Sequence, residues 1–132
     1  MKTQFTAIAL LCAASAMCSA QAMTKDEYKA SKEKIEATYK ADKKACDGMK
    51  DNAKDVCEKE AKAKEKVAMA ELEQGYKPSS KNSRKVEEAK ADSAYDVAKE
   101  KCEDQKGDAE KACKKDAKAT HETAMKAAKG KA

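Results

Sequence analysis

Large apolar and aromatic side chains are scarce in this chain of 132 residues. It contains no Trp, one Phe and four Tyr, and beyond residue 22 the residues Leu, Ile, Val and Phe number only six. This scarcity excludes an ordinary globular core and, taken alone, is typical of a disordered chain. Charged residues, however, make up 40% of the sequence, and its richness in Ala, Lys and Glu is typical of long helices. We therefore expect a helical protein in which cross-links compensate for a thin core.

The sequence also lacks the residue patterns on which most enzyme sites are built. It has a single His, no Cys-x-x-Cys, no Gly-x-Ser-x-Gly and no Gly-rich phosphate loop. Thiol exchange, hydrolysis and phosphoryl transfer each need one of these arrangements to activate a nucleophile or hold a phosphate. We expect a protein that is not an enzyme and that carries no cofactor.

The N-terminus has the pattern of a secretory signal peptide over residues 1–22. Lys2 supplies a positive charge, residues 5–17 are apolar or small, and Ala20 and Ala22 place small residues before a cleavage point. An apolar stretch of about 13 residues is shorter than the roughly 20 that a membrane-spanning helix needs. We expect Sec-type export to a bacterial periplasm, with secretion as the alternative, and no transmembrane segment after cleavage.

An internal repeat is the strongest pattern in the remaining sequence. Shifting the chain by 56 residues superposes two Cys, a Tyr and a Met on their counterparts, which composition alone does not explain. The chain is therefore expected to hold two copies of one supersecondary unit. The aligned pairs include Tyr39 and Tyr95, Cys46 and Cys102, Cys57 and Cys113, and Met69 and Met125.

Each copy has the pattern of two helices joined by a turn. Thr24 and Glu27 have the spacing of a capping box, which begins a helix. Within the copies, Asp51-Asn52 and the aligned Gly107-Asp108 are typical of a helix end followed by a helix cap, so we expect a turn midway between the cysteines. Between the copies, Pro78 and its Ser-rich neighbours predict a linker.

These patterns together predict an all-α fold of tandem helical hairpins, similar to short coiled coils, with up to four helices. The expected organisation is a signal peptide at 1–22, a first hairpin at 23–75, a linker at 76–83 and a second hairpin at 84–132. Acidic-to-basic pairs four residues apart recur along the helices, so most of the charge is expected to form solvated faces.

Four cysteines follow the signal region, at Cys46, Cys57, Cys102 and Cys113, and an oxidising compartment favours disulfides between them. A turn inside each copy would pair Cys46 with Cys57 and Cys102 with Cys113, which we favour. Without that turn, cysteines eleven residues apart would lie about 16 Å apart on one helix. They would then pair across the linker, as Cys46 with Cys113 and Cys57 with Cys102, a connectivity similar to that of mitochondrial twin Cys-x9-Cys proteins. Sequence alone does not choose between the two.

Two alternative functions have a basis in the sequence. His121 and Met125 lie four residues apart on one helix face, a soft ligand pair suited to copper, although a surface His and a packed Met give the same pattern. The net charge of +5 and the basic tail from Lys126 to Ala132 would suit an envelope polyanion such as lipopolysaccharide phosphates. Both signs of charge alternate through the body and no aromatic platform is present, so nucleic acid is not an expected partner.

The segments MTKDEYKASKEKIEATYKADKKAC and KDVCEKEAKAKEKVA resemble small exported Lys/Ala/Glu-rich proteins of beta-proteobacteria, which are often described as TolA-like cell-envelope proteins. The resemblance covers most of the chain after residue 22. It implies a periplasmic helical protein with a structural, stress-related or partner-binding role in the cell envelope, acting on an envelope protein or surface component. The sequence does not identify that partner or the oligomeric state.

Overall fold

The computed structural model describes residues 22–130, and this part of the chain is a set of helices without strands. The expected all-α fold of tandem, disulfide-stapled hairpins is confirmed. The predicted signal peptide lies, but for Ala22, outside the described residues. The helices are α1 (Lys25–Ala45), α2 (Asp51–Tyr76), α3 (Ser80–Lys101) and α4 (Asp108–Gly130), with short 3-10 turns η1 (Cys46–Gly48) and η2 (Cys102–Asp104).

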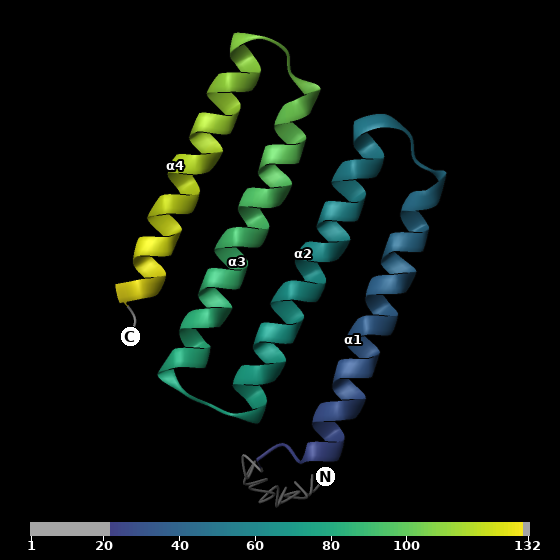
Figure 1. The fold of residues 1–132 in the computed structure, drawn as a ribbon, viewed down its shortest axis with the longest axis vertical. Coiled ribbons are helices and arrows are strands. Elements are labelled where there is room, and N and C mark those ends of the chain that lie inside the picture. Colours follow the sequence, from purple (N-terminus) through teal and green to yellow (C-terminus); the bar gives the residue numbers. More distant parts are fainter. Residues whose placement is uncertain (1–21, 131–132) are drawn as a thin grey trace, which may run out of the picture.

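The four helices form a single layer, in which they lie side by side in chain order (Figure 1). Among the described residues, extensive helix–helix contacts join only α1 with α2, α2 with α3 and α3 with α4. The edge helices α1 and α4 therefore have one neighbour each, and both broad faces of the layer are open. A closed four-helix bundle, in which every helix has two neighbours, is not formed.

The helix starts and the connection between hairpins follow the local chemistry of the sequence. Thr24 and Glu27 form the expected capping box at the start of α1, with each side chain bound to the other's backbone N–H. Ser79 caps α3, because its hydroxyl accepts a hydrogen bond from the Asn82 backbone N–H at 3.1 Å. The non-helical connection is confined to residues 77–79, inside the expected linker, so α2 and α3 are longer than the linker prediction implied.

The turn within each hairpin lies closer to the first cysteine than the sequence predicted. Helix α1 ends directly before Cys46, and the chain reverses through η1, so that Asp51 is already the first residue of α2. Asp51 and its repeat counterpart Gly107 nevertheless have left-handed backbone conformations, with φ of 52° and 65°. The pattern therefore marked the first residue of α2 in the first copy and the residue just before α4 in the second, whereas the reversal itself is made by the 3-10 turn that precedes it.

Each hairpin is closed by its own disulfide. Cys46 pairs with Cys57 at a Cα–Cα distance of 5.7 Å, and Cys102 pairs with Cys113 at 5.6 Å. The local pairing is therefore confirmed and the pairing across the linker is not formed. Cys46 and Cys102 are the most deeply buried large side chains, with exposed fractions of 0% and 1%.

The apolar core is thin, as the composition predicts. Within residues 22–130, Leu72 and Val86 are the only larger aliphatic residues that are buried, and most of the other buried apolar residues are Ala. Small side chains let helix axes approach closely but bury little apolar area each, so they contribute little free energy per contact. The disulfides are therefore expected to carry a large share of the stability. The buried residues are Cys46, Ala61, Leu72, Val86, Ala89, Ala91, Ser93, Cys102 and Ala128.

The first prediction concerns these cross-links. Replacing both cysteines of one hairpin by Ser, either at Cys46 and Cys57 or at Cys102 and Cys113, should lower the free energy of unfolding by about 3 kcal/mol, because a short closed loop no longer restricts the unfolded chain. Urea unfolding followed by circular dichroism measures the change. Reduction of the parent protein should cost more than either double substitution, and an unchanged urea midpoint in both variants would contradict the assignment.

Candidate functional site

A concave groove with a volume of about 250 Å³ lies between α1 and α2. Its floor is apolar, and its rim carries charges of both signs. We refer to it as the α1–α2 groove. It is lined by Lys34, Ile35, Thr38, Tyr39, Asp42, Ala61, Lys64, Glu65 and Ala68.

The groove exists because large side chains on α1 meet small ones on α2. Ile35 and Tyr39 lie four residues apart on α1, so they share the face that packs on α2. The opposing helix offers Ala61, which is buried, and Ala68, which is half-buried. Two Ala residues cannot fill the space beside an Ile and a Tyr, and an open apolar channel is left between the helices.

The rim of the groove is held by ion pairs that leave it mixed in charge. Lys64 on α2 reaches Asp42 on α1 at 3.3 Å, which ties the two helices together. Glu65 pairs with Lys62 at 2.6 Å, and the hydrogen bond between them raises the pKa of Lys62 above its ordinary value. No group here is arranged as a nucleophile with a base. The arrangement is chemically suited to contact apolar side chains and satisfy flanking charges.

The groove continues across the same face of the layer. A second shallow groove, between α2 and α3, shares Lys64 and Ala68 with the first and adds Val67 and Val97. A third, between α3 and α4, shares Ala94 with the second. We call this side of the layer the groove face. It presents small apolar side chains on α2, α3 and α4, and the larger Ile35 and Tyr39 on α1.

A polar cluster joins α2, α3 and α4, and two of its residues, Tyr95 and His121, also line the groove between α3 and α4. His121 on α4 lies with Nε2 at 2.8 Å from Asp92 Oδ1 on α3, and Lys66 on α2 donates to Asp92 Oδ2 at 3.0 Å. The Tyr95 ring stacks on His121 with centroids 4.8 Å apart. Burial of Asp92 opposes its ionisation, but the hydrogen bonds from His121 and Lys66 outweigh that effect and hold the pKa of Asp92 below its ordinary value.

One residue of the predicted copper pair, His121, belongs to this cluster. His121 and Met125 lie one turn apart on α4, both half-buried, and the Nε2 atom of His121 is engaged by Asp92. Over residues 22–130, the structure brings together no group of three or more His, Cys, Asp or Glu side chains suited to a metal ion. Copper binding by the pair stays a prediction.

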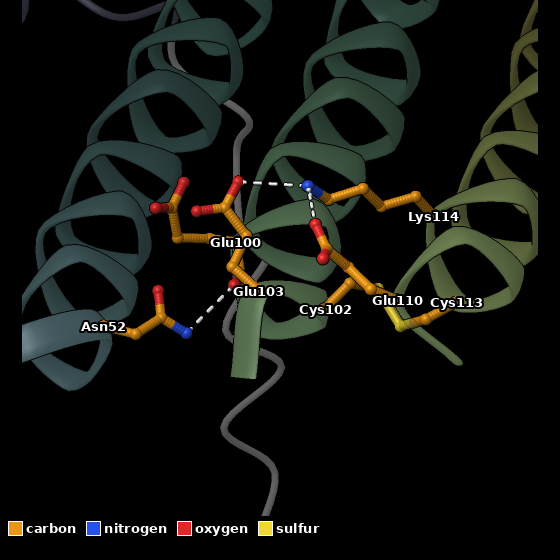
Figure 2. Close-up of a disulfide and its surroundings, with 7 residues drawn as sticks. All are labelled: Asn52, Glu100, Cys102, Glu103, Glu110, Cys113 and Lys114. Carbon is orange, nitrogen blue, oxygen red and sulfur yellow. Dashed lines mark hydrogen bonds and ion pairs between the residues drawn. A yellow bond between two sulfur atoms is a disulfide. The ribbon is translucent and has the colours of Figure 1, made fainter. Parts of the chain in front are cut away.

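The predicted cysteines occupy the turn ends of the hairpins, where they organise contacts between repeats. Near the second disulfide, Asn52 on α2 donates a hydrogen bond of 3.1 Å to the backbone carbonyl of Glu100 on α3 (Figure 2). Lys114, beside Cys113, bridges Glu103 at 3.3 Å and Glu110 at 2.7 Å. The hydrogen bond to Glu110 raises the pKa of Lys114, so the ammonium stays charged. The role of this region is structural.

Sequence reasoning singled out His121 but not its partners. Asp92 and Lys66 are two of many charged residues, and only the packing of three helices brings them to one imidazole. The repeat held a usable signal, however. At the aligned positions the first copy has Glu65 in place of His121 and Glu36 in place of Asp92, whereas Tyr is retained. His121 and Asp92 both differ from the residues at the aligned positions of the first copy, whereas the neighbouring Tyr is the same in both copies. This difference is a sequence signal that indicates the cluster.

Comparison with known proteins places the chain in no family. No protein-family model, no curated protein and no solved structure matches its sequence or fold. Within residues 22–130, none of the helices combines the length and the apolar character needed to cross a membrane. The site therefore has to be interpreted from its own geometry.

The second prediction concerns Asp92. Because its pKa is lower in the folded protein, the ionised carboxylate stabilises the fold above about pH 4, and this contribution is lost as the pH falls through the folded-state pKa. Asp92→Asn should therefore lower the free energy of unfolding at pH 7 by up to about 1 kcal/mol, since the pair is partly exposed, with 38% of the Asp92 side chain accessible.

The same comparison at low pH gives the sharper test. Once the pH has fallen below the folded-state pKa of Asp92, the parent carboxyl is protonated, and the difference between parent and Asp92→Asn should disappear. The matched control is Asp96→Asn, on the same helix at an exposed position. A stability difference for Asp92→Asn that stays constant from pH 7 to below the folded-state pKa would show that its charge contributes nothing.

Proposed function

We propose that this protein is a non-enzymatic scaffold of the bacterial cell envelope whose α1–α2 groove binds an amphipathic helix of another envelope protein. The observation that carries the proposal is the groove itself, an apolar channel with a mixed-charge rim at the open edge of a helical layer. A periplasmic location is supported by the signal-type N-terminus and by the two disulfides.

A helix is the occupant that fits the groove best. The channel runs between two antiparallel helices of 21 and 26 residues, and a third helix laid along it would contact both. Its apolar residues at i, i+3, i+4 and i+7 would meet Ile35, Tyr39 and the small Ala positions, and its polar flanks would meet the charged rim. Small-molecule sites are usually 300–1,000 Å³ and enclosed, whereas this groove is smaller and open along one side.

The location of the groove supports partner binding rather than a purely internal role. Helix α1 is an edge helix with α2 as its main neighbour, so the space beside it is accessible. Helices α2 and α3, in contrast, are each covered on two sides. A helix laid in the groove would give α1 a second neighbour on the groove face, without disturbing the α2–α3 packing.

The third prediction tests this proposal in the cell. A photo-crosslinking amino acid in place of Thr38, which lines the groove, should capture one envelope protein, and the captured segment should be an amphipathic helix. The same amino acid in place of Ala37, an exposed neighbour outside the groove, is the control and should capture little. A synthetic peptide of the captured segment should bind the purified protein.

A substitution in the floor of the α1–α2 groove then tests whether the peptide binds in the groove or elsewhere on the surface. Ala68→Glu places an unpaired carboxylate against the bound helix and should weaken peptide binding at least tenfold, because the charge is desolvated on binding. Ala41→Glu, at an exposed position of α1 outside the groove, should bind as the parent does. Equal capture from Thr38 and Ala37, or unchanged binding by Ala68→Glu, would rule out the groove as the site.

A further inference from the structure

The two edge helices carry the same pattern of lysines, and the pattern does not come from the repeat. On each helix five Lys and one Glu follow the spacing K-x3-K-x2-K-x3-E-x3-K-x2-K, and the two sets are offset by 86 residues rather than by the repeat length of 56. We call them the edge lysine stripes. They consist of Lys25, Lys29, Lys32, Glu36, Lys40 and Lys43 on α1, and Lys111, Lys115, Lys118, Glu122, Lys126 and Lys129 on α4.

The inner helices show which charges occur at the positions that the repeat aligns with the stripes. The repeat aligns α1 with α3 and α2 with α4, so each stripe has a counterpart on an inner helix. Those counterparts mix both signs of charge, and the stripes are found only where a helix has one neighbour. The counterpart positions are Lys81, Lys85, Glu88, Asp92, Asp96 and Lys99 on α3, and Asp55, Lys59, Lys62, Lys66, Ala70 and Glu73 on α2.

Both stripes lie on the side of the layer opposite the groove face. Residues of an α-helix are turned by about 100° from one to the next, so the six positions of each stripe fall within an arc of about 80°. On α1 that arc is opposite Lys34 and Thr38, which line the α1–α2 groove. On α4 it is turned away from Asp116 and Thr120, which line a groove between α3 and α4. The α4 stripe faces further toward the outer edge.

The stripe lysines are exposed and largely without partners, unlike Lys59, Lys62 and Lys66 on α2. All ten are exposed, and among the described residues the five on α1 form no ion pair. On α4, Lys111 pairs with Asp108, and Lys118 lies 3.9 Å from Glu122 within its own stripe. Between the stripes, three acids bind neighbouring cations. These pairs are Glu100 with Lys59, Asp92 with Lys66, and Glu65 with Lys62.

The dimensions of the layer indicate what such a pair of stripes can contact. Each stripe covers 18 residues of helix rise, about 27 Å, and three helix spacings of 8–10 Å separate α1 from α4 by roughly 24–30 Å. A small anion reaches only part of one stripe. An extended, flat array of anions reaches both, since the helices lie in one layer (Figure 1).

We infer that the edge lysine stripes bind this protein to a membrane surface of anionic phospholipid, with the layer lying on its lysine face. The lipid phosphates would contact both stripes, and each lysine near an anionic bilayer strengthens binding about fivefold. This surface is distinct from the α1–α2 groove, which faces the other way. The inference therefore goes beyond the proposed function, and either can fail without the other.

The test uses sedimentation of the exported, disulfide-bonded protein with vesicles. Binding to vesicles containing phosphatidylglycerol should be strong at low salt, absent with pure phosphatidylcholine, and sharply weakened as ionic strength rises. Neutralising four lysines of one stripe to Gln should weaken binding by about 100-fold or more. The α1 variant changes Lys25, Lys29, Lys32 and Lys40, and the α4 variant changes Lys115, Lys118, Lys126 and Lys129.

A matched control variant loses the same number of lysine charges at positions outside the stripes. Its four exposed lysines, none of them in a stripe, are also changed to Gln, and it should lose less than about fivefold, with circular dichroism confirming helix content in every variant. The control positions are Lys34, Lys44, Lys50 and Lys106. Equal losses of vesicle affinity in the stripe and control variants would overturn the inference, because binding would then depend on the net charge of the protein and not on the stripes. Failure to bind anionic vesicles at low salt, or tighter binding to a short DNA duplex than to the vesicles, would also overturn it.

Discussion

The fold depends on one covalent constraint, applied twice: a disulfide that joins the end of one helix to the second turn of the next. The cysteines fix how far each helix is displaced along its partner, and one fully buried cysteine side chain, Cys46 or Cys102, lies at the turn end of each hairpin. With mostly Ala between the helices, apolar burial alone would not hold that register firmly. The groove and the lysine stripes keep their geometry only while the register holds.

A second constraint explains why the hairpins remain a layer. Closing the row into a bundle would bring α1 and α4 together and bury one broad face. The groove face carries the charged rim with Lys34, Asp42 and Lys64, and the opposite face carries the stripes, so either closure would take many charges out of water. The apolar area available between Ala-rich helices is too small to offset that desolvation. The open layer keeps the charges hydrated.

The sequence contains much of this fold and little of its tertiary arrangement. The spacing of Cys46, Cys57 and their counterparts, together with the capping box at Thr24, predicts stapled hairpins because these are local features with short-range causes. The predicted position of the turn was wrong by a few residues, since the 3-10 turn at Cys46 has no distinctive side-chain pattern. The order of packing has a weaker signal: α2 places Ala61 toward α1 but Val67 and Ala70 on its far side, as an inner helix must. The meeting of Asp92 with His121 needs three helices in place, so no local pattern encodes it.

The separation of the two faces gives the layer a property that a closed bundle lacks. A bundle has one outer surface, and a helix bound to it competes with every other contact for the same exposed faces. In a single layer, the lysine face can rest on an anionic bilayer while the groove face remains directed to the aqueous side, because the stripes on α1 are opposite Lys34 and Thr38. Binding of a helix in the groove would then take place at a membrane surface, where confinement raises the effective concentration of a membrane-anchored partner. A modest groove could thus hold its partner without the large apolar interface that this chain, with so few large side chains, cannot build.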